Sequence, residues 1–220
     1  MFPVRIWFTK RGRAKYISHL DLNRLFIRAF NRSGLNIWYT EGFNPHPFIS
    51  FALPLSLGQE SNCEIMDFKM NDTTPLETVK ETLNRALPEG IQVVFIAAPL
   101  LKAKEIGFAA YDVTLISDKG IEAYKACKVL LLDSTPMVVT KKTKSSQSEI
   151  DLKVKLTLKE EDIAALDDRL QIRLVLPAGA GENINPALVV EALSTQTGTD
   201  FVRTRIVRTV IYDKNGKEFK

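Results

Sequence analysis

The sequence has little cysteine and little histidine, and it lacks any long apolar run. Its 220 residues include two cysteines, Cys63 and Cys127, and two histidines. Two thiols are too few for a disulfide framework or for a site with four thiolate ligands, so we expect buried free thiols and neither a metal nor a cofactor. Because no stretch of about 18 apolar residues occurs, no segment is predicted to span a membrane.

The first residues, MFPVRIWFTKRGR, also lack the continuous apolar core and the small-residue cleavage site of a signal peptide. We therefore expect a cytoplasmic protein. With 45% hydrophobic and 25% charged residues, the composition is that of an ordinary soluble globular protein. A chain of this length accommodates one large domain or two small ones, and two are favoured.

Positive charge is concentrated at the start of the chain. Residues 1–50 hold eight lysines and arginines against two acids, Asp21 and Glu41. This local excess is larger than the net charge of +4 of the whole chain, so the remaining residues are slightly acidic. A local field of one sign points to an anionic partner rather than to general solubility.

The first half of the chain has the pattern of an α+β unit. A capped helix is predicted from Ser18, as N-cap, to about Ser33, with Gly34 as its stop signal. A second helix is predicted with Thr74 as its N-cap and Pro at its first position. Strands or extended segments are predicted at 2–9, 37–41, 48–53, 63–70 and 91–99. The order β-α-β-β-α-β predicts a ferredoxin-like sandwich over residues 1–99.

Residues 100–108 are expected to be a connector, and residues 109–213 are predicted to form a second ferredoxin-like unit with one extra strand. Strands are predicted at 111–115, 136–144, 148–158, 169–177 and 201–212. Helices are predicted at 119–132, at 160–168 and from Asn185-Pro186 to Gln196. The segment 148–158 alternates most regularly and is expected to form a hairpin with 136–144 around Ser145-Ser146-Gln147. The tail after residue 212 is expected to fray.

The basic residues near the start fall into a helical stripe and a loop. Arg24, Arg28 and Arg32 recur every fourth residue, so they line one face of the predicted helix. The loop before that helix carries Lys10, Arg11, Arg13 and Lys15. Clustered lysines and arginines beside a helix N-terminus suit phosphate groups, so these residues are candidates for RNA binding. The alternative is a solvated helix face next to a flexible loop.

Both histidines lie in the same basic stretch. His19 is in the first turn of the predicted helix, and His46 lies between two prolines in the loop GFNPHP (42–47). Because histidine titrates near neutrality, His19 and His46, with Asp21, are candidates for catalysis. As metal ligands with Asp21 or Glu41 their spacing matches no established pattern, and an ordinary structural hydrogen bond explains each histidine as well.

Two blocks, KYISHLDLNRLFIRAF and YTEGFNPHPFISFALPLSLGQES, resemble the start of the bacterial radical-SAM-linked family of unknown function. The later segments EIDLKVKL and NINPALVVEAL are similar to later blocks of that family, so the resemblance covers most of the chain. It marks His19 and Asp21 as signature positions without giving them a role. It also marks the signature loop, which consists of Gly42, Phe43, Asn44, Pro45 and His46.

Members of that family occur fused to, or encoded beside, radical SAM proteins. The resemblance therefore implies a cytoplasmic accessory of a radical SAM enzyme in RNA or ribosome-related modification. The chain has no CxxxCxxC motif, so it does not itself hold the radical SAM cluster. We thus expect a non-catalytic protein that binds tRNA or rRNA. Two alternatives stay open: an RNA-processing or other enzyme that uses His19 and His46, and a protein-interaction module whose basic face docks an acidic partner.

Overall fold

The computed structural model describes the chain except for residues 143–146. The chain forms two compact units, one of residues 1–106 together with 218–220 and one of residues 107–217. The fold is α+β, with four α-helices in the described part of the chain. None of these helices is long and apolar enough to cross a membrane.

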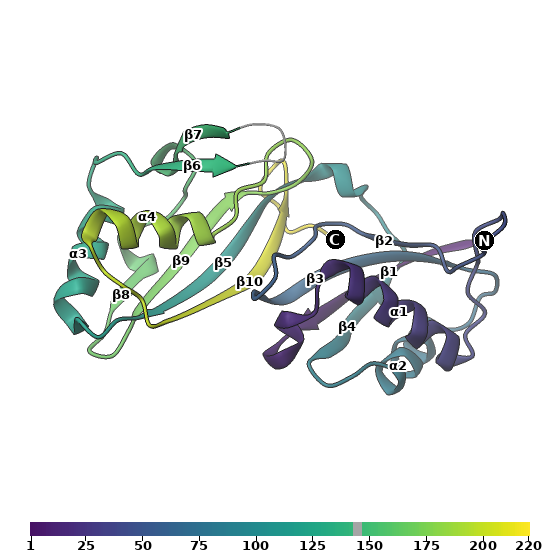
Figure 1. The fold of residues 1–220 in the computed structure, drawn as a ribbon. Coiled ribbons are helices and arrows are strands. Elements are labelled where there is room, and N and C mark those ends of the chain that lie inside the picture. Colours follow the sequence, from purple (N-terminus) through teal and green to yellow (C-terminus); the bar gives the residue numbers. More distant parts are fainter. Residues whose placement is uncertain (143–146) are drawn as a thin grey trace. The chain divides into compact units, whose positions relative to one another are not determined.

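The first unit is an antiparallel sheet with two helices on one face. Its strands follow the spatial order β4-β1-β3-β2, and each neighbouring pair is antiparallel. The helices α1 and α2 pack against each other and cover the same face of the sheet (Figure 1). The elements are β1 (Phe2–Lys10), a 3-10 helix (Gly12–Tyr16), α1 (His19–Ser33), β2 (Ile49–Phe51), β3 (Glu60–Met70), α2 (Leu76–Ala86) and β4 (Ile91–Ala97).

The core of the first unit lies between this sheet and its helices. The alternation of β1 turns Val4, Ile6 and Phe8 to the helix side, where all three are buried. On α1, Phe26 packs edge-on against Phe8, with ring centroids 5.0 Å apart. The strand and the helix predicted from the periodicity of residues 2–33 are therefore confirmed.

The ends of α1 are capped by the predicted residues, whereas the start of α2 is not. The Ser18 side chain accepts a hydrogen bond from the Asp21 N–H, and Gly34 ends α1 in the left-handed conformation. For α2 the N-cap is Pro75, so the prediction of Thr74 was wrong. The Thr74 hydroxyl instead donates to the Asp72 carboxylate at 2.7 Å, and this local bond holds Thr74 in the turn before the helix.

The opposite face of the first sheet carries an ion pair whose arginine is buried. Arg5 on β1 is 1% exposed and donates through Nε and Nη2 to the Asp67 carboxylate of β3, at 2.7 and 2.8 Å. The guanidinium also lies over the Phe219 ring, 5.0 Å from its centroid. A bidentate partner of this kind offsets the cost of burying the arginine charge.

The tail beyond residue 212 is ordered, so the prediction that it frays was wrong. The Asp213 carboxylate accepts hydrogen bonds from the N–H groups of Asn215 and Lys217 and so closes a turn. Past this turn, Phe219 is buried at 2% exposure. Burial of a phenylalanine gains enough apolar stabilisation to fix a short terminal segment.

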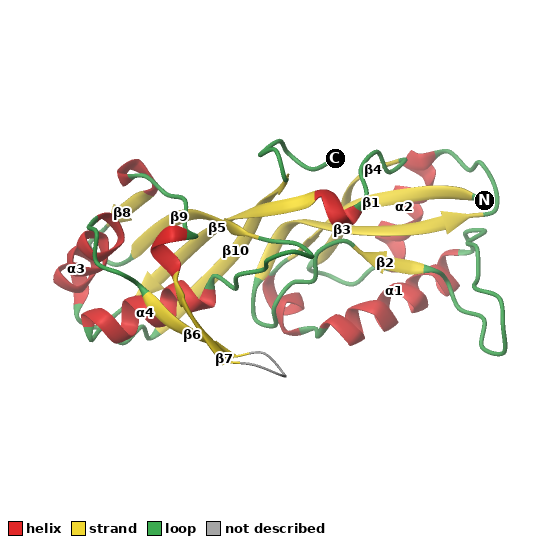
Figure 2. Ribbon diagram, turned by 90° about the horizontal axis from the view of Figure 1, so that it is seen from above, coloured by secondary structure: helices red, strands yellow, loops and turns green. Residues whose placement is uncertain are grey.

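The second unit has the same strand order with a hairpin added. Its sheet follows the order β10-β5-β9-β8. In both units, with the hairpin left aside, the strands that come first and third in the chain occupy the two central positions of the sheet. The hairpin of β6 and β7 follows α3 in the chain (Figure 2). The elements are β5 (Ile106–Ile116), α3 (Gly120–Leu132), β6 (Val138–Lys142), β7 (Gln147–Asp151), β8 (Ile163–Ala165), β9 (Leu170–Pro177), α4 (Ala187–Thr197) and β10 (Arg203–Asp213).

Two predictions for the second unit are wrong. The alternating segment 148–158 is a strand only to Asp151, and a 3-10 turn follows in which Val154 is 76% exposed. The Asp151 carboxylate accepts a hydrogen bond from the Lys153 N–H, which turns the chain out of the strand. The helix predicted at 160–168 is one 3-10 turn followed by β8, because Ile163–Ala165 pairs with β9.

Three predicted segments differ in detail. Residues 37–41 make only isolated bridges, Ile37 with Met70 and Tyr39 with Pro47. The connector predicted at 100–108 is shorter, because β5 already begins at Ile106. Of the predicted turn Ser145-Ser146-Gln147, the two serines lie outside the described residues.

Candidate nucleic-acid interface

A groove of about 450 Å³ runs along α1 and is lined by arginines. Arg24, Arg28 and Arg32 lie along it, one turn apart on the helix, so that successive positions are about 6 Å apart along the axis. Pro88, just after α2, also lines the groove. The repeat of one arginine every fourth residue, seen in the sequence, is therefore expressed as a row of cations on a concave surface.

A smaller groove of about 290 Å³ shares Arg32 and adds Arg85 of α2. Arg32 Nη2 donates to the Ala86 carbonyl oxygen at 2.7 Å, at the end of α2. A cation is favoured there because the last carbonyl groups of a helix carry partial negative charge. We call the surface formed by Arg24, Arg28, Arg32 and Arg85 the arginine groove.

Sequence reasoning missed Arg85. It lies on the exposed side of α2, more than fifty residues from the α1 stripe, and only the packing of α1 against α2 brings it to Arg32. The available signal was an arginine in the last turn of the second predicted helix, next to the apolar residues that face the core.

One carboxylate, that of Asp21, also lines the groove. Hydrogen bonds from the Ser18 hydroxyl and from Arg24 lower the pKa of Asp21 below its ordinary value of 3.8, so it stays ionised at neutral pH. Arg24 Nη1 lies 3.1 Å from Asp21 Oδ1. Arg28 makes no hydrogen bond or ion pair with any residue that the structure describes. The groove therefore keeps an excess of positive charge that is available to an anionic ligand.

The basic loop before α1 divides into exposed and buried cations. Lys10 is 1% exposed and its Nζ donates to the Ile17 carbonyl oxygen at 2.7 Å, so its predicted role in phosphate binding is not supported. Lys15 is half-buried beside Glu60. Arg11, which donates to Asn62, and Arg13 are exposed. Only these two loop cations are accessible in the way the sequence suggested.

The two histidines do not form one site. His19 is the first residue of α1, and its ring contacts Phe51, with centroids 5.1 Å apart. The loop that carries His46 is linked to the other end of α1, where the Tyr39 hydroxyl donates to Asn31. The twelve residues from His19 to Asn31 span about 18 Å of helix. A shared acid–base site or metal site of His19 and His46 is therefore not assembled in this structure.

The signature loop of residues 42–46 is held by its own backbone. The Thr40 N–H donates to the His46 carbonyl oxygen at 2.9 Å, and Tyr39 pairs with Pro47. His46 Nδ1 lies 3.0 Å from the Asn44 carbonyl oxygen; since a carbonyl only accepts, this bond requires a hydrogen on Nδ1. The backbone of Gly42 has φ of 123°, which glycine adopts without strain.

A third groove, of about 330 Å³, lies in the second unit and is lined by charges of both signs. Asp112, Glu161 and Asp162 line it with Arg173 and Arg205, and Asp112 pairs with Arg173 at 3.3 Å. The described residues contain no group of three or more His, Cys, Asp or Glu that could hold a metal ion. This groove therefore lacks the excess of positive charge that distinguishes the arginine groove.

The cysteines carry no chemistry that the structure reveals. Cys63 and Cys127 are both free, as expected. Cys127 is buried, and that burial raises the pKa of its thiol, whereas Cys63 is only partly buried. A neutral buried thiol is a poor nucleophile.

The molecule is thus an α+β protein whose first unit has a cationic groove along its helices. The chain belongs to the family described as "Uncharacterized protein conserved in bacteria (DUF2344)", which matches residues 4–186. The matched span includes the whole arginine groove and the signature loop. No curated protein matches the chain.

Proposed function

We propose that this protein binds RNA through the arginine groove, as an accessory of a radical SAM enzyme. The proposal is carried by one observation: four arginines from two helices line adjoining grooves that contain a single carboxylate. Guanidinium groups bind phosphate oxygens bidentately, and rows of them are the electrostatic footprint of nucleic-acid binding. The exposed Arg11 and Arg13 add positive charge before the start of α1.

The partner and the kind of RNA are proposed from the resemblance of the sequence blocks. The SHLDL block contains Asp21 of the groove, and the EGFNPHP block forms the loop linked to the other end of α1. Both blocks therefore frame the same helix. Since the chain has no CxxxCxxC motif, the radical chemistry would belong to the partner, and this protein would hold the tRNA or rRNA substrate.

We further propose that each unit is a ferredoxin-like sandwich, over residues 1–99 and 109–213. The strand orders β4-β1-β3-β2 and β10-β5-β9-β8 support this proposal. In a ferredoxin-like sandwich each of two βαβ units encloses a strand of the other, so the first and third strands lie at the centre of the sheet. The β6–β7 hairpin would then be an insertion in the second sandwich. Fold alone assigns no activity, so the functional proposal depends on the groove.

Binding of a tRNA or rRNA fragment as a function of salt concentration tests the RNA proposal. A triple variant, Arg24→Ala with Arg28→Ala and Arg32→Ala, is expected to lower the slope of log affinity against log salt by about two. The matched control replaces the exposed Lys102, Lys104 and Lys159 by alanine, with the same change of charge. An affinity that is independent of salt, or an equal loss in both triple variants, would contradict RNA binding at the groove.

Co-purification from cells with and without nuclease treatment tests the partner. A radical SAM protein retained only without nuclease would be linked through RNA, and one retained after nuclease would contact this protein directly. If no radical SAM protein is recovered in either case, the accessory role fails while the RNA-binding result stands by itself.

A further inference from the structure

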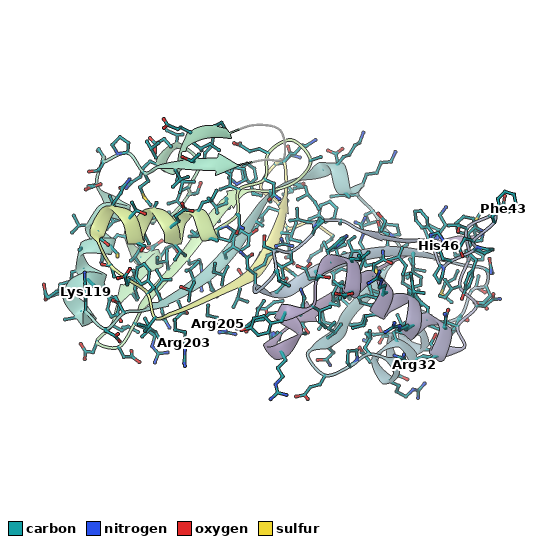
Figure 3. All side chains as sticks on the ribbon, in the orientation of Figure 1. Arg32, Phe43, His46, Lys119, Arg203 and Arg205 are labelled. Atoms are coloured by element: carbon teal, nitrogen blue, oxygen red, sulfur yellow. The ribbon has the colours of Figure 1, made fainter. Side chains whose placement is uncertain are left out.

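The loop between α1 and β2 presents aromatic rings to solvent. Phe43 is completely exposed at 112%, and Tyr39 and Phe48 are exposed at 41% and 36%. Figure 3 shows Phe43 at the outer end of this loop, beyond His46. We call the segment from Trp38 to Phe48 the aromatic loop. The Phe43 ring therefore gains no apolar stabilisation from the fold, and, together with Tyr39 and Phe48, it is accessible to a ligand.

Backbone hydrogen bonds close the base of the aromatic loop, and Phe43 lies beyond them. Besides the Thr40–His46 backbone bond, the Phe48 N–H donates to the Trp38 carbonyl oxygen at 3.3 Å. The Trp38 and Phe48 rings lie 6.1 Å apart, and Lys69 Nζ lies 4.8 Å and 5.0 Å from their respective centroids. A loop whose backbone is already closed loses less conformational entropy when it binds a ligand.

The aromatic loop is attached to the last turn of α1, the helix that carries the row of arginines. The Tyr39 hydroxyl donates to Asn31 Oδ1 at 2.7 Å, and Asn31 lies three residues after Arg28, on the same side of the helix. Arg32 in turn lines both parts of the groove. A ligand that follows the arginines from Arg24 to Arg32 therefore reaches the last turn of α1, where the loop is attached.

We propose that the aromatic loop stacks the bases of single-stranded RNA whose phosphates lie in the arginine groove. This inference rests on the proposed RNA binding and specifies its substrate as unpaired nucleotides. Bases can stack on Phe43 and Tyr39 only when they are not paired within a duplex. Stacking on aromatic rings is tolerant of base identity, because each base has a π face. The loop thus discriminates single strands from duplexes rather than one sequence from another.

The position of the loop favours RNA over an apolar pocket of a protein as its occupant. The loop's own charge is limited to Glu41, while Lys69 lies over its rings and the loop is bonded to the helix that carries the row of arginines. A partner at this place meets aromatic rings and cations together. This combination is typical of surfaces that bind unpaired nucleic acid.

The test compares a short unpaired oligonucleotide with a duplex that has the same number of phosphates. Each carries 2-aminopurine, whose fluorescence falls when it stacks. The unaltered protein is expected to prefer the single strand and to quench the fluorescence of its probe. Phe43→Ala should lower single-strand affinity about tenfold with an unchanged salt slope and duplex affinity. Phe43→Trp should retain stacking, and Leu100→Ala, another exposed apolar residue of the first unit, is the matched control.

The outcomes distinguish RNA binding in the arginine groove from base stacking on the aromatic loop. Loss of single-strand preference in Phe43→Ala but not in Leu100→Ala supports the stacking role. Salt-dependent binding with no such preference, or with no effect of Phe43→Ala, overturns stacking and leaves the groove proposal intact; the loop would then be a protein-docking element. Absence of any salt-dependent binding overturns both.

Discussion

The hydroxyl of Tyr39 donates to Asn31 Oδ1 at 2.7 Å, and this contact fastens the aromatic loop to the last turn of α1. Tyr39→Phe keeps the ring and removes the bond. Because the contact is exposed, we expect a change of at most about 1 kcal/mol in the free energy of unfolding. Amide exchange at Thr40 and His46 should become faster, measured by hydrogen–deuterium exchange. Unchanged exchange in this loop would show that the bond does not hold it.

The pKa of Asp21 is expected to depend on two neighbours. The hydrogen bond from Ser18 lowers it most, and Arg24 lowers it through a hydrogen bond and through its charge, so Ser18→Ala and Arg24→Ala should each raise this pKa. Carboxyl carbon shifts in an NMR titration measure both effects. A titration of Asp21 at or above 3.8 in the unaltered protein would contradict the assigned contacts.

The same lowered pKa has a consequence for stability. A carboxylate with a lower pKa in the folded state stabilises that state above its ordinary pKa, and this contribution is lost as the pH falls through the folded-state value. We therefore expect Asp21→Asn to be less stable than the unaltered protein near neutrality. Chemical denaturation should show the two converging below pH 3.8.

Asn84 of α2 is expected to protect the outer edge of β4. Its side chain accepts from the Val93 N–H at 2.8 Å and donates to the Val93 carbonyl oxygen at 2.9 Å. β4 ends the sheet order of the first unit and contains no charged residue, and such edges pair with other chains. Asn84→Ala should cost about 1–3 kcal/mol of unfolding free energy and cause association that rises with concentration.

Chemical denaturation and analytical ultracentrifugation measure these two effects of Asn84→Ala. Glu81→Ala, at an exposed position of the same helix, is the control and should change neither. A monomeric, fully stable Asn84→Ala protein would show that other features protect the edge.

Alanine substitutions at Gly90 and Gly58 distinguish the cost of backbone strain from the cost of a steric clash. They have similar positive φ values, 86° and 84°. A Cβ on Gly90 would lie 2.6 Å from the Arg11 carbonyl oxygen, whereas one on Gly58 would meet nothing within 4 Å. Gly58→Ala should cost about 1–2 kcal/mol of unfolding free energy through strain alone. Gly90→Ala should cost about 1–3 kcal/mol more, since the basic loop must shift; equal costs in denaturation curves would contradict this contact.

Sequence patterns predicted correctly those helices and strands for which neighbouring residues all indicate the same structure. The period of two in residues 2–9 and the cap at Ser18 are confirmed because neighbouring residues alone determine them. The strand predicted beyond Asp151 and the helix predicted around Ile163 were wrong. In the first case the Asp151 side chain bonds to the backbone, and in the second β9 offers a pairing partner that the local sequence does not reveal.

By itself, the sequence determined the arginine stripe of α1, the stiff loop after it and the chain's membership of one bacterial family. These depend on residue spacing along a single segment. The tertiary structure alone decided that Lys10 is buried and that Arg85 of α2 lies in a groove with Arg32. It also decided that His19 begins α1 whereas the loop that carries His46 is attached near the other end of that helix. The reason is that packing of distant segments sets burial and distance, and no local pattern encodes either.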